Sequence, residues 1–368
     1  MALGDRTRRW AALALGAALL ALAGCGEKQP TLHIYNWSDY IDPALIKAFE
    51  AETGVKVVYD TFDTAEMLET KVLTGGSGYD IVVPANHNVP RLLAARTLAP
   101  LDVSRLPGRE ALNPGKMALM EPFDPGGRYT LPYMSGTVGI GFNRAEVEKR
   151  LPGVALDSWD VVFKPANLAK LKDCGVHFLD APEDMFAIAL HYLGKDANST
   201  DPADYAAAAD LLLTLRPYVA KFHSSEYVNA LANGDACVAI GYSGDVLQAR
   251  DRAEEAGKGV VVDYVVPREG SQIWFGVFAI PADAPNPDAA YAFLAYMLRP
   301  QVIARASNYI EYANLNDRAT PLVDAEVRDN PAVYPTPEVL RRLFVTTAKD
   351  QALLQVVTRQ WVRVTTGK

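Results

Sequence analysis

Residues 32–84 have the sequence LHIYNWSDYIDPALIKAFEAETGVKVVYDTFDTAEMLETKVLTGGSGYDIVVP. Three short apolar segments within this stretch, residues 32–35, 55–59 and 80–83, predict strands, and Pro84 ends the last of them. The segments are separated by longer polar and apolar stretches with helical periodicity. The stretch therefore predicts alternating strands and helices.

Local signals place the two helices between these strands. Asp42 predicts the N-cap of the first helix, with Pro43 at its first position and Gly54 as its end, and residues 65–73 predict the second. A β-α-β-α-β order is typical of a parallel sheet covered by helices. Ligands of such sheets bind at the loops after the strands, so residues 36–40 and the loop after the third strand are candidate ligand contacts.

A second segment of the same kind follows later in the chain. Residues 176–179 and 238–241 predict strands and residues 184–193 predict a helix, before the chain returns to an apolar strand at 274–280. Residues 320–368 are predicted to be mostly helical. The sequence thus predicts two α/β lobes, with a chain that passes between them more than once.

Size and charge agree with two acidic lobes. The chain has 368 residues, 49% of them hydrophobic, and a net charge of -8. A chain of this length exceeds the size at which one hydrophobic core usually stops growing. The first 24 residues contribute a net charge of +2, which leaves -10 for the rest. An acidic body disfavours nucleic acid and anionic membrane surfaces as partners, and it suits cationic ligands.

The N-terminus has the layout of a bacterial signal peptide. Arginines precede an uncharged run that ends in Leu22, Ala23, Gly24 and Cys25. Small residues directly before a cysteine resemble a lipoprotein box, in which Cys25 is lipidated after residues 1–24 are removed. A plain secretory signal with an incidental cysteine stays open. Either interpretation places the protein outside the cytoplasm, and the first anchors it to the membrane by lipid alone.

Two further cysteines, Cys174 and Cys237, remain after Cys25. In an exported protein an even pair predicts a disulfide, although two separate thiols stay open. Cys174 and His177 have a C-x-x-H spacing, but no second pair exists to complete a zinc site. A bridge closing a loop of about 60 residues would stabilise the fold by about 4 kcal/mol.

The sequence lacks the local motifs of common enzyme classes. Its five histidines form no HExxH pair, and no GxSxG elbow, Walker loop or GxGxxG follows a strand. The glycine-rich residues 75–78 follow a helix and precede a strand, which predicts a turn. An exported hydrolase is the least favoured alternative, because catalytic triads need not be local in sequence. We therefore expect a binding protein without catalytic residues, cofactor or metal.

Several blocks of the chain carry a resemblance to a known family. They are residues 32–41, 53–57, 79–84, 157–160, 178–182, 233–241 and 319–322. With these blocks the sequence resembles the polyamine-binding solute-binding proteins of ABC importers, in particular the putrescine-binding branch, from about residue 30 to 368. The resemblance implies a monomeric periplasmic receptor that presents a small cationic ligand to an ABC transporter permease.

The family also implies the architecture, a type II periplasmic-binding-protein fold whose two lobes close on the ligand. Each lobe is expected to have a mixed or parallel sheet flanked by helices. Residues 30–136 and about 252–315 are expected to form the first lobe. Residues 137–251 and about 316–368 are expected to form the second.

Twelve positions match the family's ligand site. They are Trp37, Ser38, Asp39, Tyr40, Ala85, His87, Asp184, Tyr242, Asp245, Trp274, Gly276 and Tyr312. A diamine needs carboxylates for its ammonium groups and apolar or aromatic walls for its methylene chain. The resemblance implies that Asp245 pairs with one ammonium, that Tyr242 and Trp274 form opposite aromatic walls, and that Tyr312 matches the family's tyrosine near the second crossover.

Some of these twelve positions carry residues that depart from the family pattern. Gly276 stands where the putrescine binders have an aspartate for the second ammonium, so Gly276→Asp is expected to improve diamine binding. Ala85 replaces a serine, His87 lies nearby, and Asp184 replaces a glutamate. Losing one charge-assisted contact costs about 1.5 to 3 kcal/mol. Putrescine stays the leading ligand, with an ω-amino acid or monoamine as the alternative, and a sensor subunit as an alternative role.

Overall fold

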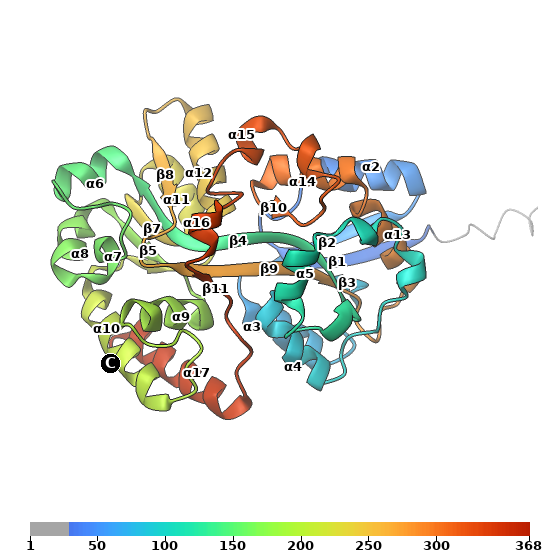
Figure 1. The fold of residues 1–368 in the computed structure, drawn as a ribbon, viewed down its shortest axis with the longest axis horizontal. Coiled ribbons are helices and arrows are strands. Elements are labelled where there is room, and N and C mark those ends of the chain that lie inside the picture. The colour runs from blue at the N-terminus through green and yellow to red at the C-terminus, as the bar shows by residue number, and fades with distance from the viewer. Residues whose placement is uncertain (1–28) are drawn as a thin grey trace, which may run out of the picture.

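The computed structural model describes residues 29–368, so the predicted signal peptide and Cys25 lie outside the described residues. One mixed sheet runs through the molecule, with strand order β2-β1-β3-β9-β4-β7-β5-β6. The strands are β1 (Thr31–Trp37), β2 (Lys56–Phe62), β3 (Ile81–Val82), β4 (Thr130–Asn143), β5 (Val176–Phe178), β6 (Lys221–Phe222), β7 (Val238–Tyr242), β8 (Val262–Val265), β9 (Ser271–Ala279), β10 (Ala313–Asn314) and β11 (Leu343–Phe344). We call the β1–β3 side of the sheet the first lobe and the β5–β8 side the second lobe (Figure 1).

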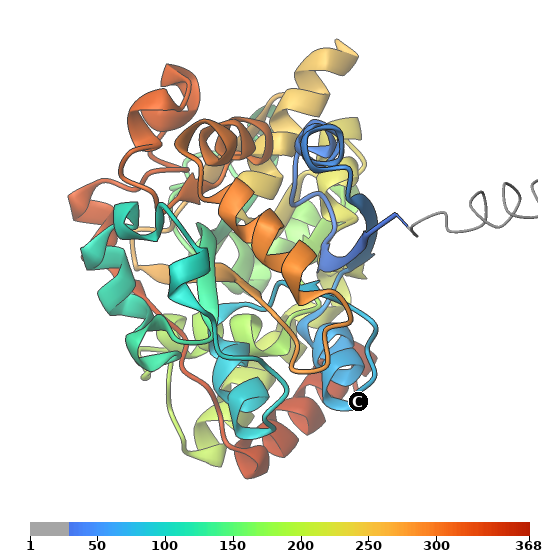
Figure 2. The same ribbon diagram turned by 90° about the vertical axis from the view of Figure 1, so that its right-hand side faces the viewer.

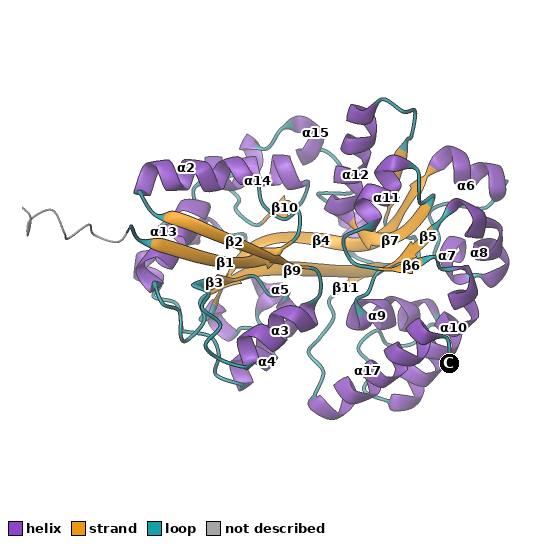
Figure 3. Cartoon of the chain, turned by 180° about the vertical axis from the view of Figure 1, so that it is seen from behind, coloured by secondary structure: helices purple, strands orange, loops and turns teal. Residues whose placement is uncertain are grey.

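Helices cover both faces of this sheet (Figures 1 and 3). The α-helices are α2 (Pro43–Thr53), α3 (Ala65–Leu73), α4 (Val89–Ala94), α5 (Pro114–Met120), α6 (Arg144–Arg150), α7 (Asp160–Phe163), α8 (Pro165–Leu171), α9 (Pro182–Tyr192), α10 (Pro202–Leu215), α11 (Tyr227–Asn233), α12 (Ser243–Ala256), α13 (Pro287–Met297), α14 (Pro300–Ile310), α15 (Ala325–Arg328), α16 (Pro337–Leu340) and α17 (Gln351–Thr366). The short 3-10 helices are η1 (Asn86–Asn88), η2 (Val103–Arg105), η3 (Arg109–Ala111), η4 (Pro125–Gly127), η5 (Lys172–Cys174), η6 (Arg216–Tyr218) and η7 (Thr320–Leu322).

The first lobe contains the predicted β-α-β-α-β unit. Strand β1 pairs in parallel with both β2 and β3. The side chain of Asp42 accepts a hydrogen bond from the backbone N–H of Ala44, and Gly54 ends α2 in the left-handed conformation with φ 71°. The predictions for this helix are therefore confirmed, because its start and stop depend on local sequence alone. Figure 2 shows this lobe end-on.

Strands β4 and β9 join the two lobes. They pair antiparallel, from Thr130 opposite Ala279 to Thr137 opposite Ile273. Beyond this stretch β4 continues into the second lobe, where it pairs with β7 and β8. The chain crosses again after α16, where β11 pairs with β9 and α17 packs on α9 and α10 (Figure 1).

These pairings differ from the division of the chain expected from sequence. Strand β8 pairs with residues 140–143 of β4, on the second-lobe side, although the sequence assigns residues from 252 onward to the first lobe. Asn316 bridges to Leu112, and η7 packs on α14, both on the first-lobe side, although the sequence begins the second lobe at 316. Backbone pairing across the sheet is non-local, so sequence blocks alone do not show where the chain crosses.

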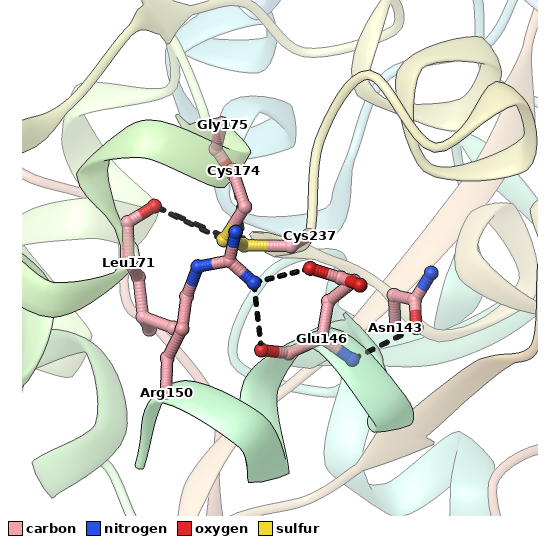
Figure 4. Close-up of a disulfide and its surroundings, with 7 residues drawn as sticks. All are labelled: Asn143, Glu146, Arg150, Leu171, Cys174, Gly175 and Cys237. Carbon is pink, nitrogen blue, oxygen red and sulfur yellow. Dashed lines mark hydrogen bonds and ion pairs between the residues drawn. A yellow bond between two sulfur atoms is a disulfide. The ribbon is translucent and has the colours of Figure 1, made fainter.

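A disulfide joins Cys174 and Cys237, as the even cysteine count predicts (Figure 4). It ties the end of η5 to the residue before β7, and the Cα atoms of the two cysteines are 5.3 Å apart. Next to it, Gly175 has φ 87°, and a Cβ there would lie 2.2 Å from the carbonyl oxygen of Asp235. Glycine is therefore required where these two backbone segments meet.

Residues 29–368 contain no candidate membrane span and no candidate metal site. None of the helices in this range is long and apolar enough to cross a membrane. The same residues include no group of three or more His, Cys, Asp or Glu side chains arranged to hold a metal ion.

Candidate functional site

A cleft between the two lobes encloses about 810 Å³ of empty space, its open mouth included. Eleven of the twelve predicted positions line it: Trp37, Ser38, Tyr40, Ala85, His87, Asp184, Tyr242, Asp245, Trp274, Gly276 and Tyr312. The sequence did not identify the other lining residues, which are Phe62, Asp63, Thr64, Ala65, Glu66, Ala181, Pro182, Glu183, Ser224 and Ser225. Many of these residues follow the carboxyl ends of β1, β2, β3, β5, β6 and β7, where parallel sheets present their ligand-binding loops.

Four aromatic side chains form a continuous wall of the cleft. The ring of Trp274 lies 5.1 Å from that of Tyr312 and 5.7 Å from that of Tyr242, both in edge-to-face geometry. Tyr40 completes the group, with its ring 5.4 Å from Tyr312 and 6.0 Å from Trp274. Such a wall covers a methylene chain and attracts a cation to the ring faces.

Asp245, in the first turn of α12, is held by two tyrosines. Its Oδ2 accepts a 2.7 Å hydrogen bond from the Tyr227 hydroxyl, and its Oδ1 accepts one of 2.7 Å from the Tyr312 hydroxyl. Burial raises the pKa of Asp245 to about 6, although these two hydrogen bonds act in the opposite direction. Both donors are neutral, and the charges of Asp39 and Arg252 act on the pKa of Asp245 in opposite directions, so the carboxylate is oriented by hydrogen bonds without an ion pair.

Asp184 is a second carboxylate of this kind, in the first turn of α9. It is buried, its Oδ2 accepts a 2.8 Å hydrogen bond from the Tyr242 hydroxyl, and its Oδ1 accepts one of 2.8 Å from Gln272. No Lys, Arg or His between residues 29 and 368 forms an ion pair with either Asp184 or Asp245. The cleft therefore holds two aspartate side chains whose hydrogen-bond donors are all neutral.

Glu183, the residue before Asp184, is paired. Arg91 of α4 reaches across the lobes to it at 2.8 Å while also contacting Glu69 of α3, and Lys349 approaches it at 3.5 Å. Burial opposes ionisation of Glu183, but the positive charges of His87, Arg91 and Lys349 outweigh it and lower the pKa of the carboxyl. This buried network links the lobes at the side of the cleft.

Gly276 has no free space on its cleft side. A Cβ at this position would lie 2.6 Å from the hydroxyl oxygen of Tyr40 and 3.1 Å from its Cε1. The Tyr40 hydroxyl is buried and has no hydrogen-bond partner within residues 29–368. Tyr40 therefore fills the space where a side chain at 276 would begin, so an aspartate there requires Tyr40 to shift, which opposes the gain in diamine binding expected from Gly276→Asp.

Three further side chains present unpaired polar atoms in the cleft. His87 is 5% exposed and Ser224 is 8% exposed, yet His87 Nδ1 and Ser224 Oγ have no partner among the described residues. The same holds for Nε1 of Trp274. Buried polar atoms normally find hydrogen bonds, so these atoms are available to a ligand or to water.

Asp39 is the one predicted residue that does not line the cleft. It has a left-handed backbone conformation, with φ 53°, and its Oδ1 forms a 3.0 Å ion pair with Arg252 of α12. Its carbonyl oxygen accepts a 3.4 Å hydrogen bond from Gln248. Asp39 thus joins the loop after β1 to the second lobe.

The comparisons with known proteins agree with this geometry. The profile of the family described as "Bacterial extracellular solute-binding protein" matches residues 44–336. The chain is 50% identical to the putrescine-binding periplasmic protein PotF of Escherichia coli K12, over 98% of this chain and 99% of that protein. It is 44% identical to the putrescine-binding periplasmic protein SpuD of Pseudomonas aeruginosa, over 97% of each chain.

Solved structures have the same fold. The spermidine/putrescine ABC transporter substrate-binding protein PotD of Streptococcus pneumoniae superposes with a TM-score of 0.74 at 30% identity. The superposition covers 92% of this chain and 99% of that one.

Proposed function

Because this chain belongs to the bacterial extracellular solute-binding proteins, we propose that it binds putrescine or a closely related polyamine and delivers it to an ABC transporter permease. The resemblance seen in the sequence is confirmed at family level, and the family acts outside the cytoplasm. Both curated relatives described above are putrescine-binding proteins, which supports a receptor rather than an enzyme.

One observation carries the proposal. Asp184 and Asp245 line the same cleft, and within the described chain their side chains are hydrogen-bonded only by neutral groups. A carboxylate removed from water is costly unless a cation compensates it. A diamine brings two ammonium groups on an apolar chain, so it supplies both missing charges while the aromatic wall covers its methylene groups.

Calorimetric titration of the protein, refolded from denaturant to remove bound amine, tests the proposal. The ligands are putrescine, cadaverine, spermidine, agmatine and 5-aminovalerate. We expect one-to-one binding with a diamine or polyamine tighter than 5-aminovalerate. Tighter binding of 5-aminovalerate would favour an ω-amino acid receptor, and no binding of any amine would refute the proposal.

The membrane anchor is a separate part of the proposal. The small residues before Cys25 support cleavage after Gly24 and lipidation of the Cys25 thiol. Metabolic labelling with a radioactive fatty acid tests this: the native chain should be labelled and found in the membrane fraction, whereas Cys25→Ala should be unlabelled. Equal labelling of the two chains would exclude Cys25 as the anchor.

A further inference from the structure

The first lobe lacks the carboxylate that the family pattern places at residue 276. Tyr40 occupies that space, and Asp39 is engaged with Arg252 away from the cleft lining. Asp184 and Asp245 both belong to second-lobe helices. A dication held only by these two would be bound from one side.

Glu66 lines the opposite wall of the same cleft. It lies in the first turn of α3, whose N-cap Thr64 accepts a hydrogen bond from the backbone N–H of Met67. Its side chain is exposed, and none of the cationic side chains in residues 29–368 pairs with it. Its neighbour on the helix, Glu69, is by contrast bound by Arg91 at 2.5 Å.

Glu66 and Asp184 line the same cleft from different lobes, and both act on the pKa of the Tyr242 hydroxyl, which burial raises most. The charge of Glu66 helps to raise the pKa of the Tyr242 hydroxyl, which donates its hydrogen bond to Asp184. Although the side chain reaches solvent, surrounding atoms of the cleft partly desolvate the Glu66 carboxyl, and this desolvation, together with the negative charges of Glu183 and Glu69, raises its pKa. Hydrogen bonds from the backbone and from Thr64 act the other way. Glu66 therefore lies in a negative region where a cation would be stabilised.

Unpaired polar atoms accompany Glu66 on the cleft wall. Asp63 Oδ1, three residues earlier, is buried and has no hydrogen-bond partner in the described chain. His87, more than nine-tenths buried, leaves Nδ1 unpaired in the same cleft, and so does Ser224 with Oγ. Asp63 thus leaves an acceptor free beside Glu66, and Ser224, which follows β6, leaves one on the second-lobe side, as an ammonium group requires.

We infer that Glu66 supplies the first lobe's carboxylate for the second ammonium group of the ligand. Glu66 and Asp184 bind this ammonium group together, from opposite sides of the cleft. Asp245 holds the other ammonium. This inference rests on the proposed function. Because α3 and α9 belong to different lobes, an ammonium between Glu66 and Asp184 draws the lobes together, and Glu66 selects for a ligand charged at both ends.

Calorimetry on Glu66→Gln tests the inference, with Glu326→Gln as the control. Glu326 is exposed on α15, outside the cleft lining, and its substitution changes the net charge by the same amount. We expect Glu66→Gln to weaken putrescine binding about tenfold to a hundredfold, and 1-aminobutane binding less than about twofold, because one charge-assisted contact is lost. The monoamine is measured by displacement of bound putrescine, and thermal unfolding verifies that each variant is folded.

Two results would overturn the inference. One is equal putrescine affinity in Glu66→Gln and Glu326→Gln. The other is a loss of affinity in Asp63→Asn without a loss in Glu66→Gln, which would assign the role to Asp63. Failure of the unsubstituted chain to bind any diamine would instead refute the proposed function, so the two failures are distinguishable.

Discussion

Putrescine binding is expected to weaken about tenfold when the pH falls from 7 to 5, because Asp245 must be ionised to receive an ammonium group. The pKa of Asp245 in the ligand-free protein is about 6. About nine tenths of the molecules then carry the carboxylate at pH 7, and about one tenth at pH 5. Alkylammonium groups resemble that of Lys and keep their protons over this range, so the ligand contributes little to the change.

The raised pKa of Asp245 also makes the stability of the ligand-free protein depend on pH, but in the opposite direction to the affinity: stability falls as the pH rises. The folded-state pKa of about 6 exceeds the ordinary value of 3.8, so folding favours the protonated form of Asp245. The stability that this group contributes is complete below about pH 3.8 and is lost as the pH rises through 6. Above that pH the loss is about 2 to 3 kcal/mol, because a pKa that differs by one between the folded and unfolded states corresponds to about 1.4 kcal/mol.

Asp245→Asn separates these effects. Asn keeps the size of the side chain and can hydrogen-bond with both tyrosines, but it has no charge. The variant should bind putrescine at least a hundredfold more weakly at pH 7, because removing one partner of a buried pair costs about 3 to 5 kcal/mol. Its ligand-free form should unfold at a higher temperature than the native protein at pH 7, with little difference at pH 4.

The assays are calorimetric titration with putrescine at pH 5, 6 and 7 and thermal unfolding at pH 4 and 7, both on the native chain and on Asp245→Asn. Native affinity that is constant between pH 5 and 7 would refute the reasoning. A pH dependence that persists unchanged in Asp245→Asn would assign the titration to another group in the cleft.

Three further substitutions have definite expected outcomes. Gly276→Asp alone should fail to strengthen putrescine binding in calorimetry, because the new side chain overlaps the Tyr40 hydroxyl and such overpacking costs about 1 to 3 kcal/mol. Adding Tyr40→Phe should recover part of the lost affinity. Stronger binding by Gly276→Asp alone would contradict this account. Replacing Cys174 and Cys237 by Ser should lower the free energy of unfolding, measured by denaturant titration, by about 4 kcal/mol. Putrescine affinity should stay unchanged because neither cysteine lines the cleft. Unchanged stability would show that the bridge is dispensable. Arg91→Gln should weaken putrescine binding about tenfold, because its ion pair with Glu183 between the lobes is lost. Small-angle X-ray scattering of the ligand-bound variant should show a more open shape. Unchanged affinity and shape would show that Arg91 has no part in closing the lobes.

The parts of the fold that could be predicted from sequence depend on local signals. Helix α2 has its cap at Asp42 and its stop at Gly54, and both are visible as residue types at fixed positions. The disulfide follows from two cysteines left in an exported chain. The aromatic positions of the cleft came from the resemblance to a family, since no periodicity distinguishes a core tryptophan from one at a ligand site.

The parts that could not be predicted depend on contacts between distant segments. Lys349 lies 166 residues from Glu183 in the chain and contacts it from the segment before α17. That segment is irregular, within a region expected to be mostly helical. The consequence of Gly276 was also non-local, because the group that fills its space, Tyr40, comes from the loop after β1. An acidic residue in the first turn of α3 was the available signal for Glu66, but such residues are common at helix starts.

Helix α12 connects ligand binding to the contact between the lobes. Its first turn carries Asp245, and further along the same helix Gln248 donates to the carbonyl oxygen of Ile310 at 3.1 Å, while Arg252 pairs with Asp39 at 3.0 Å. Asp245 itself is hydrogen-bonded to Tyr312, on the first-lobe side. An ammonium group at Asp245 compensates a carboxylate that burial otherwise disfavours in its ionised form. Opening the lobes would break the other contacts of the same helix. Because one rigid element bears both sets of contacts, a ligand that stabilises the ionised Asp245 also stabilises the closed arrangement.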